Sequence, residues 1–280
     1  MNLTNYHSHT QFCDGHAKME DFVLNAIDNG FSSYGFSPHA PLPFRTEWTM
    51  DDKESVNAYF AEFNRLKNKY ADVIELYSGM EIDYLNTESN PANDYFQSLP
   101  LDYRIGSVHM LYSENDEIID IDCNKETFKL RLEQYFHNDL KYLVQLYYNR
   151  LLCMIELGGF DFIGHADKIS NNANFCQPGI REEVWYRKIA NNYFETIAAK
   201  KIMLEINTKQ FHRFDVFYPN QQYFSLLHKL KIPVLVNSDS HYPELINDGR
   251  KEALQALSAA GIHSVMELKK GVWVEREIVL

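Results

Sequence analysis

The sequence has few cysteines, no long apolar run and no excess of positive charge, and each shortage excludes a class of protein. Only four cysteines occur in 280 residues, and no two of them form a CxxC pair. So few cysteines without an export signal indicate reduced thiols in the cytoplasm. No apolar stretch approaches the ~20 residues that a membrane-spanning helix needs. Residues 1–10 are polar and lack the basic-then-apolar pattern of a signal peptide. We therefore expect a cytoplasmic protein without a membrane partner.

Positive charge is in the minority. Lysine and arginine number 27 against 39 aspartates and glutamates, which gives a net charge of −12. This excess of acid disfavours a nucleic-acid partner and an anionic membrane surface. It leaves an anionic substrate open, because bound metal ions reverse the local sign of charge. Apolar residues at 45% and charged residues at 24% are typical of a folded globular chain.

No Gly/Ser linker, low-complexity segment or repeat interrupts the chain, so we predict a single domain over residues 1–280. Short apolar runs predict a first strand that ends near His7 and His9, and further strands at 33–37, 73–82, 103–110, 160–164, 203–206 and 233–236. Amphipathic patterns predict helices at 19–27, 51–71, 127–158, 182–200, 222–231 and 248–260. The long 127–158 stretch is apolar on more than one face, which predicts a buried or bent helix. The alternating tail, 272–280, predicts a last strand.

The alternation of short strands with helices indicates parallel strands joined by crossover helices. About seven such units without an internal boundary favour a closed β/α barrel. The alternative is an open, doubly wound sheet.

Histidine is the most informative residue type. Six of the eleven histidines stand at or just after the end of an apolar run, and Glu81 ends the third run. These histidines are His7, His9, His39, His109, His165 and His241. Because the carboxyl ends of barrel strands meet on one face, we expect these side chains and Asp239 to converge. Neutral imidazole with carboxylate is a ligand set for Zn²⁺, Mn²⁺ and Fe²⁺.

Each of these signals is weak alone. An HxH pair is often structural, and a single histidine at a strand end is more often a hydrogen-bonded core residue than a metal ligand. The coincidence of seven ligand-type residues at run ends is what predicts a metal centre. His137, His228 and His263 lack this context and are interpreted as surface or packing residues, whereas His212 is ambiguous.

These motifs resemble the PHP (polymerase and histidinol phosphatase) family. The resemblance rests on HxHT followed by DG, a histidine after the second strand, GxE, GSVH, GH and a final DxH, in that order from His7 to His241. Residues 7–15 (HSHTQFCDG) and 37–41 (SPHAP) are similar to the histidinol-phosphatase branch. The resemblance implies a distorted seven-stranded (β/α) barrel with three divalent metal ions on the face of the carboxyl strand ends.

The resemblance also implies the ligands of each ion. The first ion would take His7, His9, Glu81 and Asp239. The second would take Glu81, His109 and His165. The third would take Asp14, His39 and His241, with His16 as the alternative to Asp14. Pro38 stands where the family usually has aspartate and Cys13 where it usually has serine, and neither change removes a ligand.

The implied activity is hydrolysis of L-histidinol phosphate, a small phosphate ester, in histidine biosynthesis. A phosphate ester is a dianion, so three divalent ions would offset its charge together with that of the carboxylates. We expect direct attack on phosphorus by a metal-bridging hydroxide, which is available at neutral pH because metal binding lowers the pKa of water. Asp239 or His241 would return a proton to the leaving alkoxide.

Three cationic residues are candidates for phosphate or substrate contacts. Lys168 and Arg213 follow strand ends, in loops where the family's phosphatases place arginines, and Arg45 with Trp48 would line the mouth of the site. For each cation the alternative is a solvated surface charge.

Three other functions stay open. The first is a PHP phosphoesterase acting on nucleotides or oligonucleotide ends. The second is an amidohydrolase-type barrel, which usually bridges its metals with a modified lysine that the third and fourth runs here do not supply. The third is a non-catalytic metal-binding module.

Overall fold

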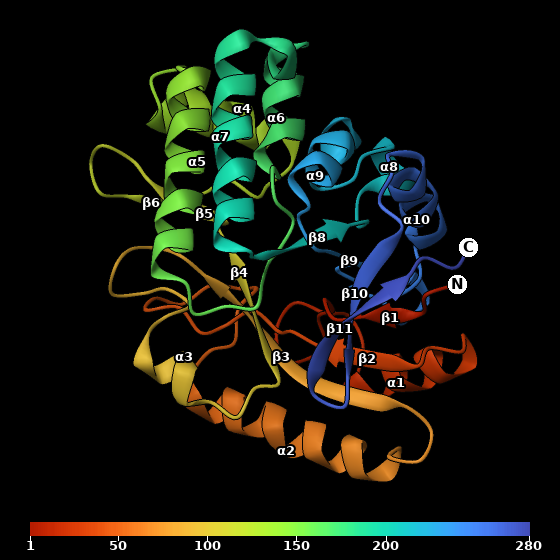
Figure 1. The fold of residues 1–280 in the computed structure, drawn as a ribbon. Coiled ribbons are helices and arrows are strands. Elements are labelled where there is room, and N and C mark those ends of the chain that lie inside the picture. Colours follow the sequence, from red (N-terminus) through yellow and green to blue (C-terminus); the bar gives the residue numbers. More distant parts are fainter.

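The computed structural model describes residues 1–280, and its centre is a sheet of seven parallel strands (Figure 1). In sheet order the strands are β1 (Thr4–Asn5), β2 (Ser33–Phe36), β3 (Glu75–Asp83), β4 (Tyr103–Ser107), β7 (Phe162–Ile163), β8 (Met203–Asn207) and β9 (Val234–Asn237). Beyond β1 and β9, a parallel bridge joins Ser8 to Ser240, where His9 N donates to Ser240 O at 2.8 Å. The sheet therefore curls into a nearly closed barrel. The predicted barrel is confirmed, and the open doubly wound sheet is wrong.

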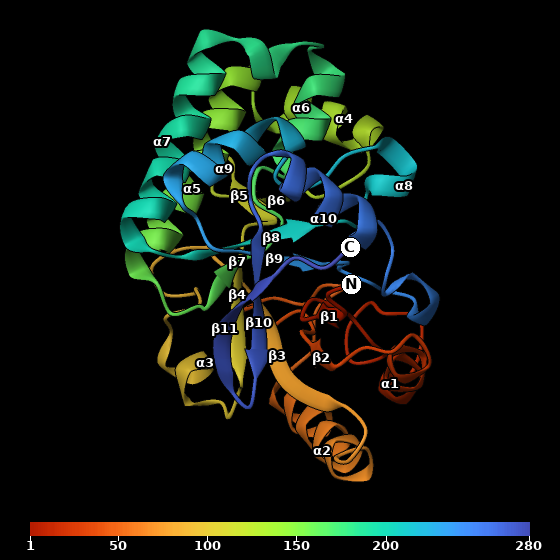
Figure 2. The same ribbon diagram turned by 45° about the vertical axis from the view of Figure 1, so that its right-hand side comes forward.

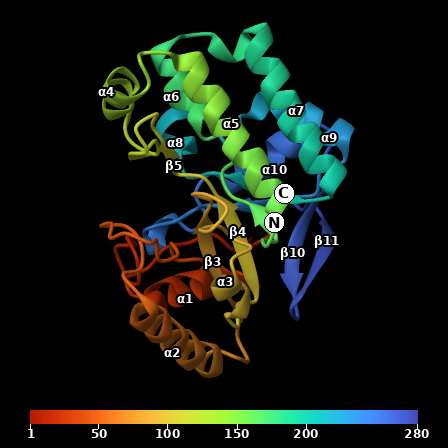
Figure 3. The same ribbon diagram turned by 90° about the vertical axis from the view of Figure 1, so that its left-hand side faces the viewer.

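Two groups of helices cover the barrel on opposite sides (Figures 1 and 3). One group is α1 (Met19–Asp28), α2 (Lys53–Lys69) and α3 (Asp94–Ser98); the other is α4 (Lys125–Tyr135), α5 (Leu140–Leu157), α6 (Ile169–Cys176) and α7 (Val184–Lys200). Short α8 (Phe211–Phe214), α9 (Phe224–Leu230) and α10 (Arg250–Ala259) follow, with single 3₁₀ turns at Ile180–Glu182, Gln221–Tyr223 and Pro243–Leu245. None of these helices combines the length and the hydrophobicity of a membrane span.

The sequence pattern of α2 shows why such a helix forms here. Asp52 caps it by accepting hydrogen bonds from the backbone N–H groups of Glu54 and Ser55. Val56, Tyr59 and Phe63 recur at helical spacing and are buried against the barrel. The N-terminal cap and the single apolar stripe therefore both favour a helix over the same residues.

The predicted helix at 127–158 is wrong in one respect, because it is two helices, α4 and α5. His137 and Asn138 have positive φ angles of 55° and 57°, which break the helix. Asp139 then caps α5 through the backbone N–H of Tyr142. The predicted strand at 103–110 is also divided: β4 ends at Ser107, and β5 (Met110–Tyr112) turns away to pair antiparallel with β6 (Ile118–Asp120).

A hairpin of β10 (Ser264–Lys269) and β11 (Val272–Glu277) closes the amino-terminal end of the barrel (Figure 2). Leu268 and Trp273 pack there against Tyr6, Tyr103 and Phe162. The predicted last strand is thus confirmed as β11, and its partner β10 was not predicted. Because this end is filled with aromatic side chains, only the carboxyl ends of the strands are free to form a site.

The barrel interior needs glycine opposite Tyr103. A Cβ atom on Gly79 would lie 2.2 Å from the Tyr103 ring, and one on Gly35 would lie 2.4 Å from the Tyr103 hydroxyl. The hydroxyl donates to Tyr6 O at 2.7 Å. Tyr103 therefore fills the middle of the barrel directly below the polar residues of the strand ends.

Candidate metal centre

Side chains of metal-ligand type meet at the carboxyl ends of the strands. They come from the loops after β1, β2, β4, β7 and β9 and from β3 itself, and nearly all are buried. The converging residues are His7, His9, Asp14, His39, Glu81, His109, His165, Asp239 and His241. We call them the ligand cluster.

Glu81 lies at the middle of the cluster. Its Oε2 is 3.1 Å from His7 Nε2 and 3.0 Å from His39 Nδ1. Its Oε1 is 2.7 Å from His165 Nε2 and 3.4 Å from His109 Nε2. One carboxylate therefore faces imidazoles from four different loops, so Glu81 could contribute a ligand to more than one metal ion.

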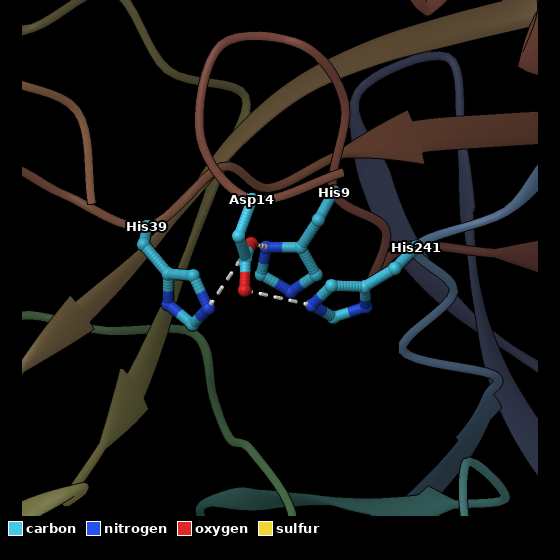
Figure 4. Close-up of side chains that lie close together, drawn as sticks. All are labelled: His9, Asp14, His39 and His241. Carbon is cyan, nitrogen blue, oxygen red and sulfur yellow. Dashed lines mark hydrogen bonds and ion pairs between the residues drawn. The ribbon is translucent and has the colours of Figure 1, made fainter. Parts of the chain in front are cut away.

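A second group surrounds Asp14, whose carboxylate points between three imidazoles (Figure 4). Asp14 lies 3.2 Å from His241 Nε2, 3.7 Å from His9 Nδ1 and 3.8 Å from His39 Nε2. The loop can fold this tightly because residue 15 is glycine: a Cβ there would lie 2.2 Å from His9 O.

Of the two alternatives for this position, the structure brings Asp14 and not His16 into the cluster. The exposed ring of His16 stacks on Tyr242 instead, with ring centres 4.4 Å apart.

The cluster contains buried polar atoms without hydrogen-bond partners. They are His7 Nε2, His9 Nε2, Asp14 Oδ1, His39 Nδ1 and Glu81 Oε2. Each unsatisfied buried group costs about 1–3 kcal/mol, so five together need a common partner. A divalent cation accepts imidazole nitrogen and carboxylate oxygen alike. The residues present therefore fit divalent metal ions.

The protonation states agree with this fit. Burial, together with the imidazoles of His39 and His241, holds the pKa of His9 well below its usual value, so the ring is neutral. Burial alone would raise the pKa of Glu81, but surrounding imidazoles, first among them that of His7, hold it well below its usual value. Neutral imidazole and ionised carboxylate are the forms that bind metal.

His7 differs from His9 in its electrostatics. Burial disfavours its charged form, yet the carboxylates of Glu205, Asp239 and Glu81 raise its pKa well above the usual value. The surplus of negative charge around His7 calls for a cation, and a metal ion at Nε2 would take the place of the proton.

Two further carboxylates orient the imidazoles from behind. Glu205 Oε1 accepts from His7 Nδ1 at 2.7 Å, and Glu205 Oε2 accepts from His165 N at 2.7 Å. Asp83 lies 3.0 Å from His109 Nδ1 and accepts from His109 N at 2.8 Å. With Nδ1 as donor, the Nε2 lone pairs of His7 and His109 point into the cluster.

Two adjacent cavities lie beside the cluster. The inner cavity, about 180 Å³, is lined by Asp14, Glu81, His109 and Trp48 among others. The outer cavity, about 410 Å³, continues toward α4, α6 and α8. Four residues line both cavities and form the wall that they share: Asp122, Lys168, Lys209 and Asp239.

The comparisons with known proteins agree with this geometry. The model of the PHP domain matches residues 5–209. The chain belongs to the PHP domain family. The Schizosaccharomyces pombe protein named "Probable histidinol-phosphatase" is 27% identical over 95% of this PHP chain and 89% of its own length. The histidinol-phosphatase of Lactococcus lactis is 26% identical over 95% of this chain and 94% of its own.

Solved structures share the PHP barrel. A Listeria monocytogenes protein assigned to the histidinol phosphatases superposes with a TM-score of 0.77 at 23% identity, over 89% of this chain and 99% of its own. The Lactococcus lactis histidinol phosphate phosphatase, in complex with zinc, L-histidinol and phosphate, gives 0.66 at 20% identity, over 98% and 99%.

The three cationic residues predicted from sequence lie at different distances from the ligand cluster. Lys168 lines both cavities, with Nζ 2.6 Å from Asp122 Oδ2. Arg213 lines only the outer cavity. Arg45 is not brought to the site: its side chain is 85% exposed, its guanidinium pairs with Asp51 at 3.2 Å, and it lines neither cavity.

Trp48, predicted from the same loop to line the mouth of the site, does lie next to the ligand cluster. The Trp48 ring packs edge-on against His39 and His109, at 4.7 and 5.5 Å between ring centres, and lines the inner cavity. His212, ambiguous from sequence, forms an ion pair with Asp248 at 2.5 Å and lines neither cavity.

Sequence reasoning missed Asp83, Glu205, Lys209 and Asp122. Asp83 is two residues after Glu81, and the period of a strand puts both on one face. Glu205 is a charged residue inside a strand buried on both faces, which is unusual enough to be a signal. Lys209 Nζ lies 3.2 Å from Asp239 Oδ1 and 3.4 Å from His241 Nε2.

Proposed function

We propose that this chain, as one barrel domain over residues 1–280, is a metal-dependent phosphatase that hydrolyses L-histidinol phosphate to L-histidinol and phosphate. The observation that carries the proposal is the buried set of unpartnered imidazole and carboxylate atoms below an open cavity. The relatives named histidinol-phosphatase support the substrate, since they align over 84–95% of the chain.

We propose three divalent ions, of zinc, manganese or iron. His7, His9, Glu81 and Asp239 would hold the first; Glu81, His109 and His165 the second; Asp14, His39 and His241 the third. When bound, such ions neutralise a phosphate dianion and lower the pKa of water to about 7, which supplies a nucleophile at neutral pH. The Lactococcus lactis structure, which contains zinc, supports a divalent metal and zinc among these ions.

The residues of the shared wall would handle the phosphate. Lys168 and Lys209 line the inner cavity, and their ammonium groups would donate charge-assisted hydrogen bonds to phosphate oxygens. Asp239 or His241 would return a proton to the leaving alkoxide. Lys209 Nζ lies 3.2 Å from Asp239 Oδ1 and 3.4 Å from His241 Nε2, so its charge would act on both groups. Trp48 would cover the site and limit access of bulk water.

The decisive experiment measures phosphate release by the zinc-loaded or manganese-loaded protein from L-histidinol phosphate, nucleoside monophosphates and sugar phosphates. We expect kcat/KM for L-histidinol phosphate to exceed the other values by about 100-fold or more, which is ~2.7 kcal/mol of transition-state discrimination. A preference for nucleotides would reject the substrate and favour a nucleotide-specific PHP phosphoesterase.

Two variants connect the activity with the cluster. His109→Asn removes an imidazole that faces Glu81, whereas His137→Asn removes one whose side chain is 70% exposed. We expect the first variant to lose activity and bound metal and the second to keep both. Equal activities in the two variants would reject the cluster as the site of hydrolysis.

A further inference from the structure

The wall between the two cavities carries a charge that phosphate binding does not explain. Of its four residues, Lys168 and Lys209 suit a phosphate, and Asp239 belongs to the ligand cluster. Asp122 is a carboxylate that belongs to none of the possible metal-binding groups. It lies 2.6 Å from Lys168 Nζ, so it weakens the attraction of that lysine for an anion.

The neighbouring Asp120 is already accounted for by the fold. Its Oδ1 accepts from the backbone N–H of Asp122 at 2.7 Å, and its Oδ2 pairs with Arg131 at 3.2 Å. The Asp122 side chain keeps 37% of its surface exposed, and both cavities touch it. A carboxylate accepts several hydrogen bonds at once, so Asp122 has room for a second cation besides Lys168.

We infer that Asp122 binds a protonated amine of the substrate. The site would thus select phosphate monoesters that carry an ammonium group close to the ester oxygen. This inference rests on the proposed function and deepens it, because L-histidinol phosphate has such an amine on the carbon next to the ester methylene. The amine meets Asp122 when the phosphate lies in the inner cavity and the remainder of the molecule extends into the outer one.

The outer cavity fits the remainder of such a molecule. Asn124, Asn171 and Asn172 line it with neutral amides, and Tyr147 and Tyr218 line it with largely buried aromatic side chains. A cavity of about 410 Å³ holds a small heteroaromatic ring without leaving room for a long chain. Further phosphate groups would meet the carboxylate of the shared wall, which disfavours nucleoside polyphosphates.

The test combines one substitution in the protein with the removal of one group, the amine, from the substrate. The wild-type protein and Asp122→Asn, both zinc-loaded, are assayed with L-histidinol phosphate and with 3-(imidazol-4-yl)propyl phosphate, which lacks the amine. We expect Asp122→Asn to lose about tenfold or more in kcat/KM on the first ester and to change little on the second, because only the first loses a charge-assisted hydrogen bond.

Equal losses of kcat/KM on the two esters would overturn the inference but not the proposed function, since Asp122 would then act only through Lys168. If the wild type hydrolysed neither ester but did hydrolyse nucleotides, the proposed function and the inference would both fail. Asp116→Asn, in the exposed β5–β6 turn, is the matched control and should leave both values unchanged. Equal zinc content and circular dichroism in all variants establish that the comparison concerns the substrate and not the fold.

Discussion

Single residues behind the ligand cluster decide how well its imidazoles can bind metal. Glu205 is fully buried and accepts four hydrogen bonds: from His7 Nδ1, His165 N, Asn207 Nδ2 and Asn237 Nδ2. It thereby fixes the tautomer of His7 and holds the backbone at His165, whose φ of 23° is strained. All of its lone-pair positions are engaged, and it donates nothing.

This arrangement makes Glu205→Gln a sharp test. The amide places an NH₂ group where only acceptors fit, so it opposes either His7 Nδ1 or His165 N. We expect affinity for zinc to fall roughly 10- to 100-fold, the range for groups that orient metal ligands. Titration against a competing chelator measures the change. Glu195→Gln, on the exposed face of α7, should bind zinc like the wild type. Unchanged affinity in Glu205→Gln would show that the imidazoles hold their orientation without it.

The contrast between Glu81 and Glu205 shows what sequence can predict at this scale. Glu81 stands at the end of an apolar run, where strand ends of a barrel converge, so its place in the site follows from position alone. Glu205 stands inside a run, and its partners His7 and Asn237 are 198 and 32 positions away. Which residues meet across the barrel depends on the register of the strands, and no local sequence pattern predicts that register.

At the scale of elements, the weakest seam of the barrel is also the most important for the site. β1 and β9 meet through one bridge, Ser8 to Ser240, yet the loops after these strands supply His7, His9, Asp239 and His241. Side chains reinforce the seam. Asn5 Oδ1 accepts from Ser238 N at 2.7 Å, and Asn5 Nδ2 donates to His7 O at 3.0 Å.

Arg250 of α10 completes the seam. It is 1% exposed, with Nη1 donating to Val236 O at 2.9 Å and Nη2 directed to Asn5 Oδ1 at 3.4 Å. We expect Arg250→Met to lower zinc affinity roughly tenfold, because the two ligand loops lose their common anchor. The stability of the metal-free protein should change less, since Met fills the volume without burying a charge.

Two measurements separate these effects: zinc titration, and urea unfolding of the metal-free protein. Arg276→Met, on the exposed part of β11, is the control and should alter neither. A large loss of stability with intact zinc affinity would make Arg250 a packing residue and contradict its role in alignment.

Elements were predictable where one local signal dominated. Apolar runs located β2, β3, β8 and β9 to within about two residues, because central parallel strands are apolar on both faces. The break between α4 and α5 was not predicted, since residues 136–139 carry no Gly or Pro and use His137 and Asn138 in the left-handed region instead. β10 was missed because the buried Leu268 and the partly buried Met266 pack against the aromatic residues at the amino-terminal end of the barrel, and the strand shows no regular alternation.

At the scale of the whole molecule, the ligand cluster joins two separate apolar cores. One core packs α1 and α2 against β2 and β3, and the other packs α5, α7 and α10 against β8 and β9. His39 and Glu81 belong to the first side, and His109, His165 and Asp239 to the second. At the carboxyl end of the barrel the junction between them is polar, and it contains the buried cluster atoms that lack hydrogen-bond partners.

Metal ions should therefore stabilise the whole fold as well as the site. A ligand present at about 1,000 times its dissociation constant adds ~4 kcal/mol to the free energy of unfolding. For a chain of this size that corresponds to a rise in Tm of roughly 10 °C. We expect dialysis against a chelator to lower Tm by about this amount and zinc to restore it. Calorimetry measures the shift, and His109→Asn, with a ligand removed, should show a smaller one. Equal Tm values for the loaded and the stripped wild-type protein would mean that the two cores hold together without the ions.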